Sequence, residues 1–475
     1  MRRSVPSAIS RYALASIVLA GVTIAGGLQH APGRAAAAAP VTLTFYDGGL
    51  YSTYADNDLK AIVSQYQKLH SNVTIKFIPY NGNYVTDIST ALAGGTAADI
   101  VVPTAMQQIW TDVAKGYWED LTPYYNQPDP YLPEHESLAK ALLPSALSSM
   151  RFYDGKYYVL GTTSVDGAFF YNKRIFAKAG IKNTPATWDQ FIADLKAIKA
   201  AGYIPIEGPL ADTAYDEPMP VLLTAIEAQV MGKTIKQLDL NHDGTVDVRE
   251  LALGMEKHVY SASNPEFQEA LHLYASLVPY MERGATGVSE QAARNIFSAG
   301  RAAILYDGLW VGSGFDTAKP PVDWGAFPVP RVTSASSKFA YPGTHGTGVY
   351  GPGTAIAFAI PVTTVKHGHL SQVLDFLYYL MSYKNTDILT KSSASTSLLK
   401  GAHNDPRYQV FSEISAHLSP FAGAEETFPP QWAVLRQQVF IDYLTGQKSW
   451  NDMLTAMQKS MDTNAAVVLK TYHLK

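Results

Sequence analysis

The chain has 475 residues, which is too long for a single hydrophobic core, so two or three domains are expected. The formal net charge is −4 and 16% of the residues are charged, a balance that gives no electrostatic footprint for nucleic acid or for an anionic membrane. The absence of cysteine excludes disulfides, thiol nucleophiles, zinc–thiolate sites and a lipidated cysteine.

Residues 1–39 have the pattern of an export signal. Arg2, Arg3 and Arg11 give a positive start, an apolar run of 17 residues follows at 12–28, and 35–39 offers small residues for cleavage. The sequence therefore predicts a mature protein outside the cytoplasm, in the periplasm or at the cell surface. An uncleaved signal that anchors the chain to the membrane remains the alternative, because the apolar run is only slightly short for a spanning helix.

From Val41 onward, strand patterns alternate with helix patterns. Strands are predicted at 41–48, 72–80 and 98–105, and helices at 58–69, 84–93 and 106–115. This alternation predicts an α/β domain with a parallel sheet and helices on both faces. Ligands of such sheets bind beyond the carboxyl ends of the strands. Polar and aromatic residues follow those ends, among them Tyr46, Asp47 and Asn81, and they suit a polyhydroxylated ligand, although turn formation and helix capping explain Asp and Asn equally well.

The stretch 155–191 has the pattern of a chain that leaves one packed body and enters another. Extended segments are predicted at 157–163 and 168–172, and a short helix at 173–179 ends at Gly180. Thr187 and Gln190 have the spacing of a capping box at the start of the next helix.

Further helices are predicted at 189–201, 218–231, 263–278, 371–381 and 429–440, and further strands at 302–306, 323–331 and 353–361.

Three segments of the same stretch, GKYYVLG, FFYNKRIFAKAGI and PATWDQF, resemble the extracytoplasmic solute-binding proteins of ATP-binding-cassette importers, in particular carbohydrate-binding family 1, which is maltose-binding-protein-like. Leu160-Gly161 departs from the family, which often has a proline there. FSAGRAAILYDGLWVG (297–312) is also similar to the family, and the resemblance extends over most of residues 41–470.

This resemblance implies a two-lobed periplasmic-binding-protein-like fold, each lobe a mostly parallel sheet flanked by helices, with hinge crossings. Lobe one would comprise 41–160 with 361–421, and lobe two 161–360 with 422–475. The implied function is to capture a mono- or oligosaccharide by hinge closure and to deliver it to the membrane permease of the importer, as a monomer and without nucleic acid.

Seven residues are the expected ligand contacts, from strand ends and from the family pattern. Asp47 and Asp166 would accept hydrogen bonds from sugar hydroxyls, and Trp310 and Trp432 would stack on the ring. The full set is Tyr46, Asp47, Asn81, Asp166, Trp310, Tyr350 and Trp432.

No catalytic motif stands out, so no catalytic residue is predicted and the chain is not expected to be an enzyme. GTGVYG (346–351) fits a dinucleotide-binding pattern but neither follows a first strand nor opens a helix. Two other functions stay open: a secreted glycan-active enzyme, which would need two converging carboxylates, and a binding protein for polyamine, iron or peptide.

Residues 239–250, DLNHDGTVDVRE, fit the twelve-residue calcium loop of an EF-hand at every constrained position. Gly244 stands where the loop turns, and the flanking segments can both be helical. The sequence predicts a structural calcium ion here, within lobe two. Its ligands would be Asp239, Asn241, Asp243, Thr245 (through its carbonyl), Asp247 and Glu250.

Overall fold

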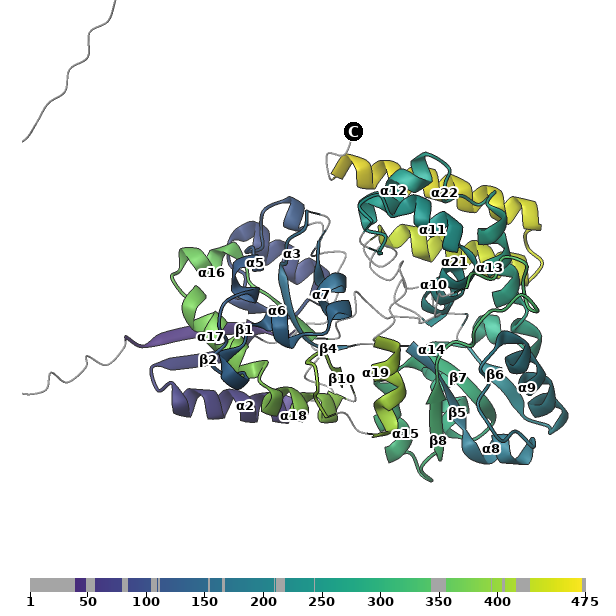
Figure 1. Cartoon of the computed structure of the whole chain (residues 1–475), viewed down its shortest axis with the longest axis horizontal. Helices are drawn as coiled ribbons and strands as arrows, with labels where there is room; N and C mark the ends of the chain where they lie inside the picture. The colour runs from purple at the N-terminus through teal and green to yellow at the C-terminus, as the bar shows by residue number, and fades with distance from the viewer. Residues whose placement is uncertain are drawn as a thin grey trace, which may run out of the picture. The chain divides into compact units, whose positions relative to one another are not determined.

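The computed structural model describes residues 39–47, 56–78, 84–103, 109, 112–152, 154–164, 167–208, 210, 218–242, 244–342, 356–393, 395–403, 406–415 and 428–471. Its helices and strands form two α/β lobes, each built on one sheet (Figure 1).

The first sheet has six strands in the order β10-β4-β9-β3-β1-β2. The strands are β1 (Val41–Tyr46), β2 (Val73–Ile78), β3 (Ile100–Val101), β4 (Val159–Ser164), β9 (Ile356–Ala359) and β10 (Thr396–Ser397). β1 runs parallel to β2 and β3, whereas β9 runs antiparallel to β3 and β4. The helices of this lobe are α2 (Asp56–Leu69), α3 (Tyr84–Gly94), α5 (Thr122–Tyr125), η1 (Pro133–His135), α6 (Leu138–Ala141), α7 (Pro144–Met150), α16 (Val362–Lys366), α17 (Leu370–Leu380) and α18 (Tyr383–Ser393).

The second sheet has four strands in the order β6-β7-β5-β8. The strands are β5 (Gly167–Asn172), β6 (Ile204–Glu207), β7 (Ala302–Gly308) and β8 (Trp324–Phe327). β5 is antiparallel to both neighbours, and β6 is parallel to β7. The remaining helices are α8 (Lys173–Lys178), α9 (Trp188–Ala200), α10 (Pro218–Val230), α11 (Gly232–Leu238), α12 (Val248–Glu256), α13 (Pro265–Ala275), η2 (Val278–Tyr280), η3 (Ala285–Gly287), α14 (Glu290–Ser298), α15 (Val311–Thr317), η4 (Pro406–Tyr408), α19 (Gln409–Ser415), α21 (Pro430–Leu444) and α22 (Trp450–Thr471).

The two-lobed α/β prediction is confirmed, but the sheets are mixed rather than mostly parallel. Parallel pairing is found where one connection carries a crossover, as in β1-α2-β2. β4 and β9 lie next to passes of the chain between the two sheets. β4 runs in the same direction as β1, β2 and β3, whereas β9 and β10 run in the opposite direction. Strand periodicity alone cannot reveal this, because it carries no information on direction.

The chain passes between the sheets near the predicted positions. β4 stays in the first sheet to Ser164, and β9 already pairs there at Ile356, so both strands extend past the predicted boundaries at 160 and 361. Farther on, Phe411 of α19 packs against Phe170 of the second sheet, although 361–421 is assigned to lobe one by the sequence. The complete lobe boundaries, which also depend on helices and loops, stay a prediction.

Strand β5 shows how the core of the second lobe is built. Successive side chains of a strand point to opposite faces, so Phe169 and Phe170 enter different apolar clusters. Phe169 packs against Phe191 and Phe327, with ring centroids 4.8 and 5.4 Å away. Both phenylalanines are fully buried, so both faces of this sheet are covered, by clusters that include residues of the surrounding helices.

Candidate functional site

Two predicted sugar contacts lie together at the carboxyl end of β1. Tyr46 is the last residue of the strand and Asp47 follows it. Both side chains are largely buried, at 4% and 9% exposed. The Tyr46 carbonyl accepts a hydrogen bond from the Val102 N–H at 2.9 Å, so the end of β1 is fixed to the segment after β3. This edge of the sheet is the expected position for a ligand.

Trp310 lies just beyond the carboxyl end of β7. Its ring covers Gly308 so closely that a Cβ at that glycine would lie 2.0 Å from the ring carbons. A glycine is therefore required for this position of the indole. The Trp310 ring is partly exposed and packs against the apolar core, which leaves part of an aromatic face at a strand end.

Trp432 lies in the first turns of α21 and is fully buried. The Arg436 guanidinium carbon lies 5.2 Å from the centroid of its ring. The indole Nε1 is buried and has no hydrogen-bond partner among the residues that the structure describes. A buried N–H without a partner costs free energy, so a ligand oxygen or a neighbouring group would stabilise it.

Three other predicted contacts, Asn81, Asp166 and Tyr350, lie outside the described residues. The four that are described come from the ends of strands in both sheets and from α21. The prediction that the seven form one sugar site stays untested.

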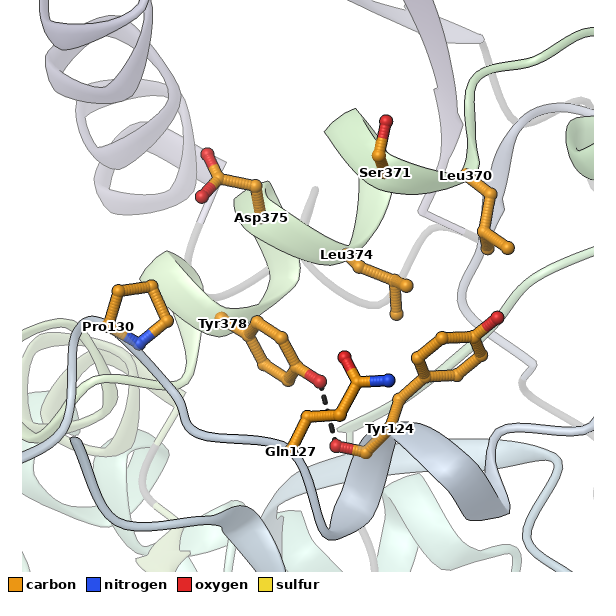
Figure 2. Close-up of a pocket in the computed structure, with 8 residues that line it drawn as sticks. All are labelled: Tyr124, Gln127, Pro130, Leu370, Ser371, Leu374, Asp375 and Tyr378. Carbon is orange, nitrogen blue, oxygen red and sulfur yellow. Dashed lines mark hydrogen bonds between the residues drawn. The ribbon is translucent and has the colours of Figure 1, made fainter. Parts of the chain in front are cut away.

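A pocket that the sequence did not predict lies in the first lobe (Figure 2). Its volume is about 440 Å³, and Leu370, Leu374 and Tyr378 of α17 face the segment that contains Tyr124 and Gln127. The Tyr378 hydroxyl donates a hydrogen bond of 2.7 Å to the Tyr124 carbonyl and fixes this segment to the helix. The full described lining is Tyr124, Gln127, Pro130, Leu370, Ser371, Leu374, Asp375 and Tyr378.

Asp375 is the one carboxylate in the described lining of this pocket. It accepts hydrogen bonds from the Tyr66 hydroxyl at 2.7 Å and from the Tyr131 hydroxyl at 3.2 Å. Burial and this hydrogen bond raise the pKa of Tyr66, so the tyrosine stays a neutral donor. One carboxylate in such a network can orient a polar ligand. A second one, at about 5–10 Å, would be needed for glycoside hydrolysis.

The predicted calcium loop joins two helices, α11 and α12, as an EF-hand requires. Gly244 has φ +86°, a value that favours glycine, and its N–H donates to Asp239 Oδ2 at 3.1 Å. Val246, within the loop, is buried. The loop thus turns at the position that the motif assigns to glycine.

The end of the loop is also the start of α12. Asp247 and Glu250 form a capping box, with the Glu250 N–H donating to Asp247 Oδ1 at 2.7 Å. The Glu250 carboxylate accepts the N–H groups of Leu240 and Asn241 at 2.8 and 3.1 Å, so it connects the start of the loop to its end. Burial raises the pKa of Asp247 to about 6.

Five of the six predicted calcium ligands are therefore described, and Asp243 lies outside the described residues. Their donors are carboxylate, amide and carbonyl oxygens, which suit a hard cation such as Ca²⁺. The chemistry of the residues present fits the predicted ion.

Residues 52–378 match the family of the bacterial extracellular solute-binding protein. The chain belongs to this family. The members of this family and the structural neighbours of the chain are binding proteins, so membership indicates binding of a solute. Within the described part of the chain, no helix combines the length and apolar character needed to cross a membrane.

Curated relatives are distant. A binding protein of Brucella abortus (strain 2308) is 25% identical over 304 residues, 62% of this chain and 64% of its own length. The diacetylchitobiose binding protein DasA of Streptomyces coelicolor is 24% identical over 300 residues, 61% of this chain and 60% of its own length. The solute-binding protein thus aligns with less than two thirds of the length of these curated relatives.

Solved structures extend the similarity in fold. RafE of Streptococcus pneumoniae in its apo form has a TM-score of 0.64 at 16% identity, covering 90% of this chain and 98% of RafE. RafE in complex with raffinose has a TM-score of 0.58. At this identity the similarity concerns the fold, and it agrees with the two lobes described above.

Proposed function

We propose that this solute-binding protein captures a mono- or oligosaccharide outside the cytoplasm and delivers it to the membrane permease of an ATP-binding-cassette importer. The observation that carries the sugar assignment is the combination of aromatic and polar side chains at strand ends, Trp310 just after β7 and Tyr46 with Asp47 at the end of β1. Aromatic faces stack on sugar rings, and carboxylates accept from their hydroxyls. DasA, which by its name binds diacetylchitobiose, and RafE, solved with raffinose, support a carbohydrate.

The proposal includes export by a signal peptide at residues 1–39, action as a monomer, and closure of the lobes by a hinge. The chain passes between the two sheets from β4 to β5 and from β8 to β9, and after β10 it enters α19, whose Phe411 packs against Phe170 of the second sheet. These passes support the hinge, because few connections must bend when two bodies move. On sugar binding, the radius of gyration measured by X-ray scattering would then decrease.

A thermal-shift screen separates a sugar from the alternative ligands. The panel contains chitobiose, raffinose, xylobiose, maltose and galactose, together with spermidine, ferric citrate and a tripeptide. A sugar at about 100 times its Kd stabilises the native protein by about 2.7 kcal/mol, so it should raise the melting temperature clearly. If spermidine, iron or peptide raises the melting temperature and no sugar does, the ligand is not a sugar and the proposal is wrong in favour of that compound. Release of hydrolysis products would indicate the enzyme instead.

Trp432→Phe should weaken binding of the sugar found in the screen about tenfold. Phenylalanine keeps most of the buried packing but removes the indole N–H, and a hydrogen bond contributes about 1–1.5 kcal/mol. Isothermal titration calorimetry on the folded variant gives the change in Kd.

Trp118→Phe is the matched control, because Trp118 is also buried with its Nε1 lacking a partner among the described residues, yet it lies in the first lobe beside Pro361. The affinity of the Trp118→Phe variant for the sugar should stay unchanged. Equal losses in the two variants would remove Trp432 from the site.

We also propose that residues 239–250 bind a structural calcium ion through Asp239, Asn241, Asp243, Thr245, Asp247 and Glu250. α12, which begins inside this loop, packs against the C-terminal helix α22. An ion there would neutralise the clustered carboxylates and strengthen this part of the second lobe. Magnesium should do less, since it requires a tighter octahedron and retains its waters.

Chelation should therefore lower the melting temperature by about 3 °C when compared with calcium at about 100 times its Kd. Glu250→Gln should abolish this difference, because the amide removes the bidentate carboxylate while its oxygen can still accept the loop N–H groups. The control is Glu256→Gln, an exposed glutamate on the same helix. A wild-type melting temperature that changes with neither chelator nor added calcium would contradict the site.

A further inference from the structure

Two histidines and one aspartate meet at the edge of the first lobe. Asp99, His367 and His369 each offer a ligand atom, and these atoms all lie within 4.8 Å of one another. Asp99 directly precedes β3, and the histidines lie in the turn between α16 and α17, two of the green helices of the first lobe in Figure 1. The cluster shares no residue with the predicted sugar contacts or with the predicted calcium loop.

Asp99 is held in place by Thr44 of β1. Asp99 Oδ2 accepts hydrogen bonds from the N–H and the hydroxyl of Thr44, both at 2.8 Å. The Thr364 hydroxyl donates to the Asp99 carbonyl at 3.0 Å. These bonds direct the other carboxylate oxygen, Oδ1, towards His369, whose Nδ1 lies 2.9 Å away. One ligand position is thus preorganised by the sheet.

The turn that contains the histidines brings both imidazoles to the same place. His367 ends α16, His369 precedes α17, and Gly368 between them has φ +75°. Glycine adopts this conformation without strain, so the chain can change direction at this single residue. The two rings lie 5.8 Å apart between centroids. His367 is exposed, so its side chain can rotate towards the other two groups.

An ion pair between Asp99 and His369 explains part of the arrangement and leaves His367 without a role. Two imidazole nitrogens and one carboxylate oxygen are, however, the donor set of three-ligand zinc sites, in which water fills the fourth position. In a tetrahedral zinc site with bonds of about 2.0–2.2 Å, the donor atoms lie about 3.3–3.5 Å apart. The exposed His367 would therefore have to rotate inwards, while Asp99 Oδ1 and His369 Nδ1, 2.9 Å apart here, would separate slightly.

We propose that Asp99, His367 and His369 bind one divalent transition-metal ion of the zinc and nickel class. The imidazoles select against Mg²⁺ and Ca²⁺, which prefer oxygen donors throughout. The ion would connect the start of β3 to the turn between α16 and α17 and thereby stabilise the first lobe. This site does not depend on the sugar or on the calcium loop.

The experiment uses mature protein without an oligohistidine tag, in buffer that contains excess calcium to saturate other oxygen sites. Zinc chloride and nickel chloride are titrated by calorimetry. We expect one zinc ion per chain and a raised melting temperature. His367→Ala and His369→Ala should each weaken zinc binding more than tenfold, since even groups that only orient a ligand contribute 10–100-fold.

Two controls make the result specific. His403→Ala removes an exposed histidine outside the cluster, and Glu250→Gln alters the calcium loop; both should bind zinc as the wild type does. Asp99 is left intact because its loss would also release Thr44. Wild-type protein that binds no zinc, or a double His367→Ala/His369→Ala variant that binds it equally well, would overturn the proposal. His367→Ala is expected to fold, since its side chain is exposed, and circular dichroism verifies this.

Discussion

Replacing Arg436 by methionine is expected to lower the free energy of unfolding by about 3–5 kcal/mol. Arg436 on α21 and Glu227 on α10 are fully buried, and Arg436 Nη1 lies 3.4 Å from Glu227 Oε1. The Tyr260 hydroxyl donates to the other carboxylate oxygen at 3.1 Å. Methionine fills much of the volume of arginine but leaves the Glu227 carboxylate buried without its cation, and such a charge is costly.

Urea denaturation measures this loss as a lower midpoint. Adding Glu227→Leu to Arg436→Met should recover a large part of it, since an apolar pair of similar volume often replaces a buried ion pair at little cost. The control is Arg301→Met, which breaks the exposed pair of Arg301 with Glu282 and should cost less than about 1 kcal/mol. Similar midpoints for Arg436→Met and the wild type would contradict the prediction.

Glu207→Gln is expected to stabilise the protein above pH 7 and to leave it nearly unchanged at pH 4.5. Glu207 ends β6 and is fully buried. Burial raises the pKa of Glu207 from 4.5 to about 7, and the negative charge of Glu282 adds to this effect. The backbone N–H of Glu282 and the charge of Arg301 act in the opposite direction and are weaker.

Because the folded protein holds the Glu207 proton more tightly than the unfolded chain does, stability falls as the pH rises from about 4.5 to about 7. At about 1.4 kcal/mol per pH unit, the loss approaches about 3 kcal/mol above pH 7. A neutral glutamine avoids it. Melting temperatures of Glu207→Gln and wild type, measured from pH 4.5 to 8, should therefore diverge as the pH rises. Parallel curves would contradict the prediction, and Glu256→Gln, at an exposed position, should follow the wild type.

Local signals allowed most elements to be predicted from the sequence. The capping box of Thr187 and Gln190 is present at the start of α9, and Gly180 has the positive φ expected after α8. These signals act within a few residues, so they can be recognised in the sequence without knowledge of the tertiary structure. The family was also recognisable, because short segments such as FFYNKRIFAKAGI resemble it.

Other features depend on contacts between distant segments and were not predicted. β6 is a four-residue strand that contains Pro205, and its pairing with β7 is what defines it. The pocket beside Tyr124 requires α17 to pack against a segment about 250 residues earlier in the chain, shown by the hydrogen bond between Tyr378 and Tyr124. The cluster of Asp99 with His369 joins residues 270 positions apart for the same reason.

The position of β9 in the first sheet has a consequence for biosynthesis. β9 pairs with β3 and with β4, yet it is made about 190 residues after β4. Until β9 is made, β3 and β4 lack the strand that lies between them. The sheet of the first lobe therefore cannot be completed while the second half of the chain is still emerging from the ribosome. Pairing over such a distance slows folding. The unfinished sheet leaves strand edges open to other chains, and a fragment that stops at residue 342 is therefore expected to aggregate rather than to fold.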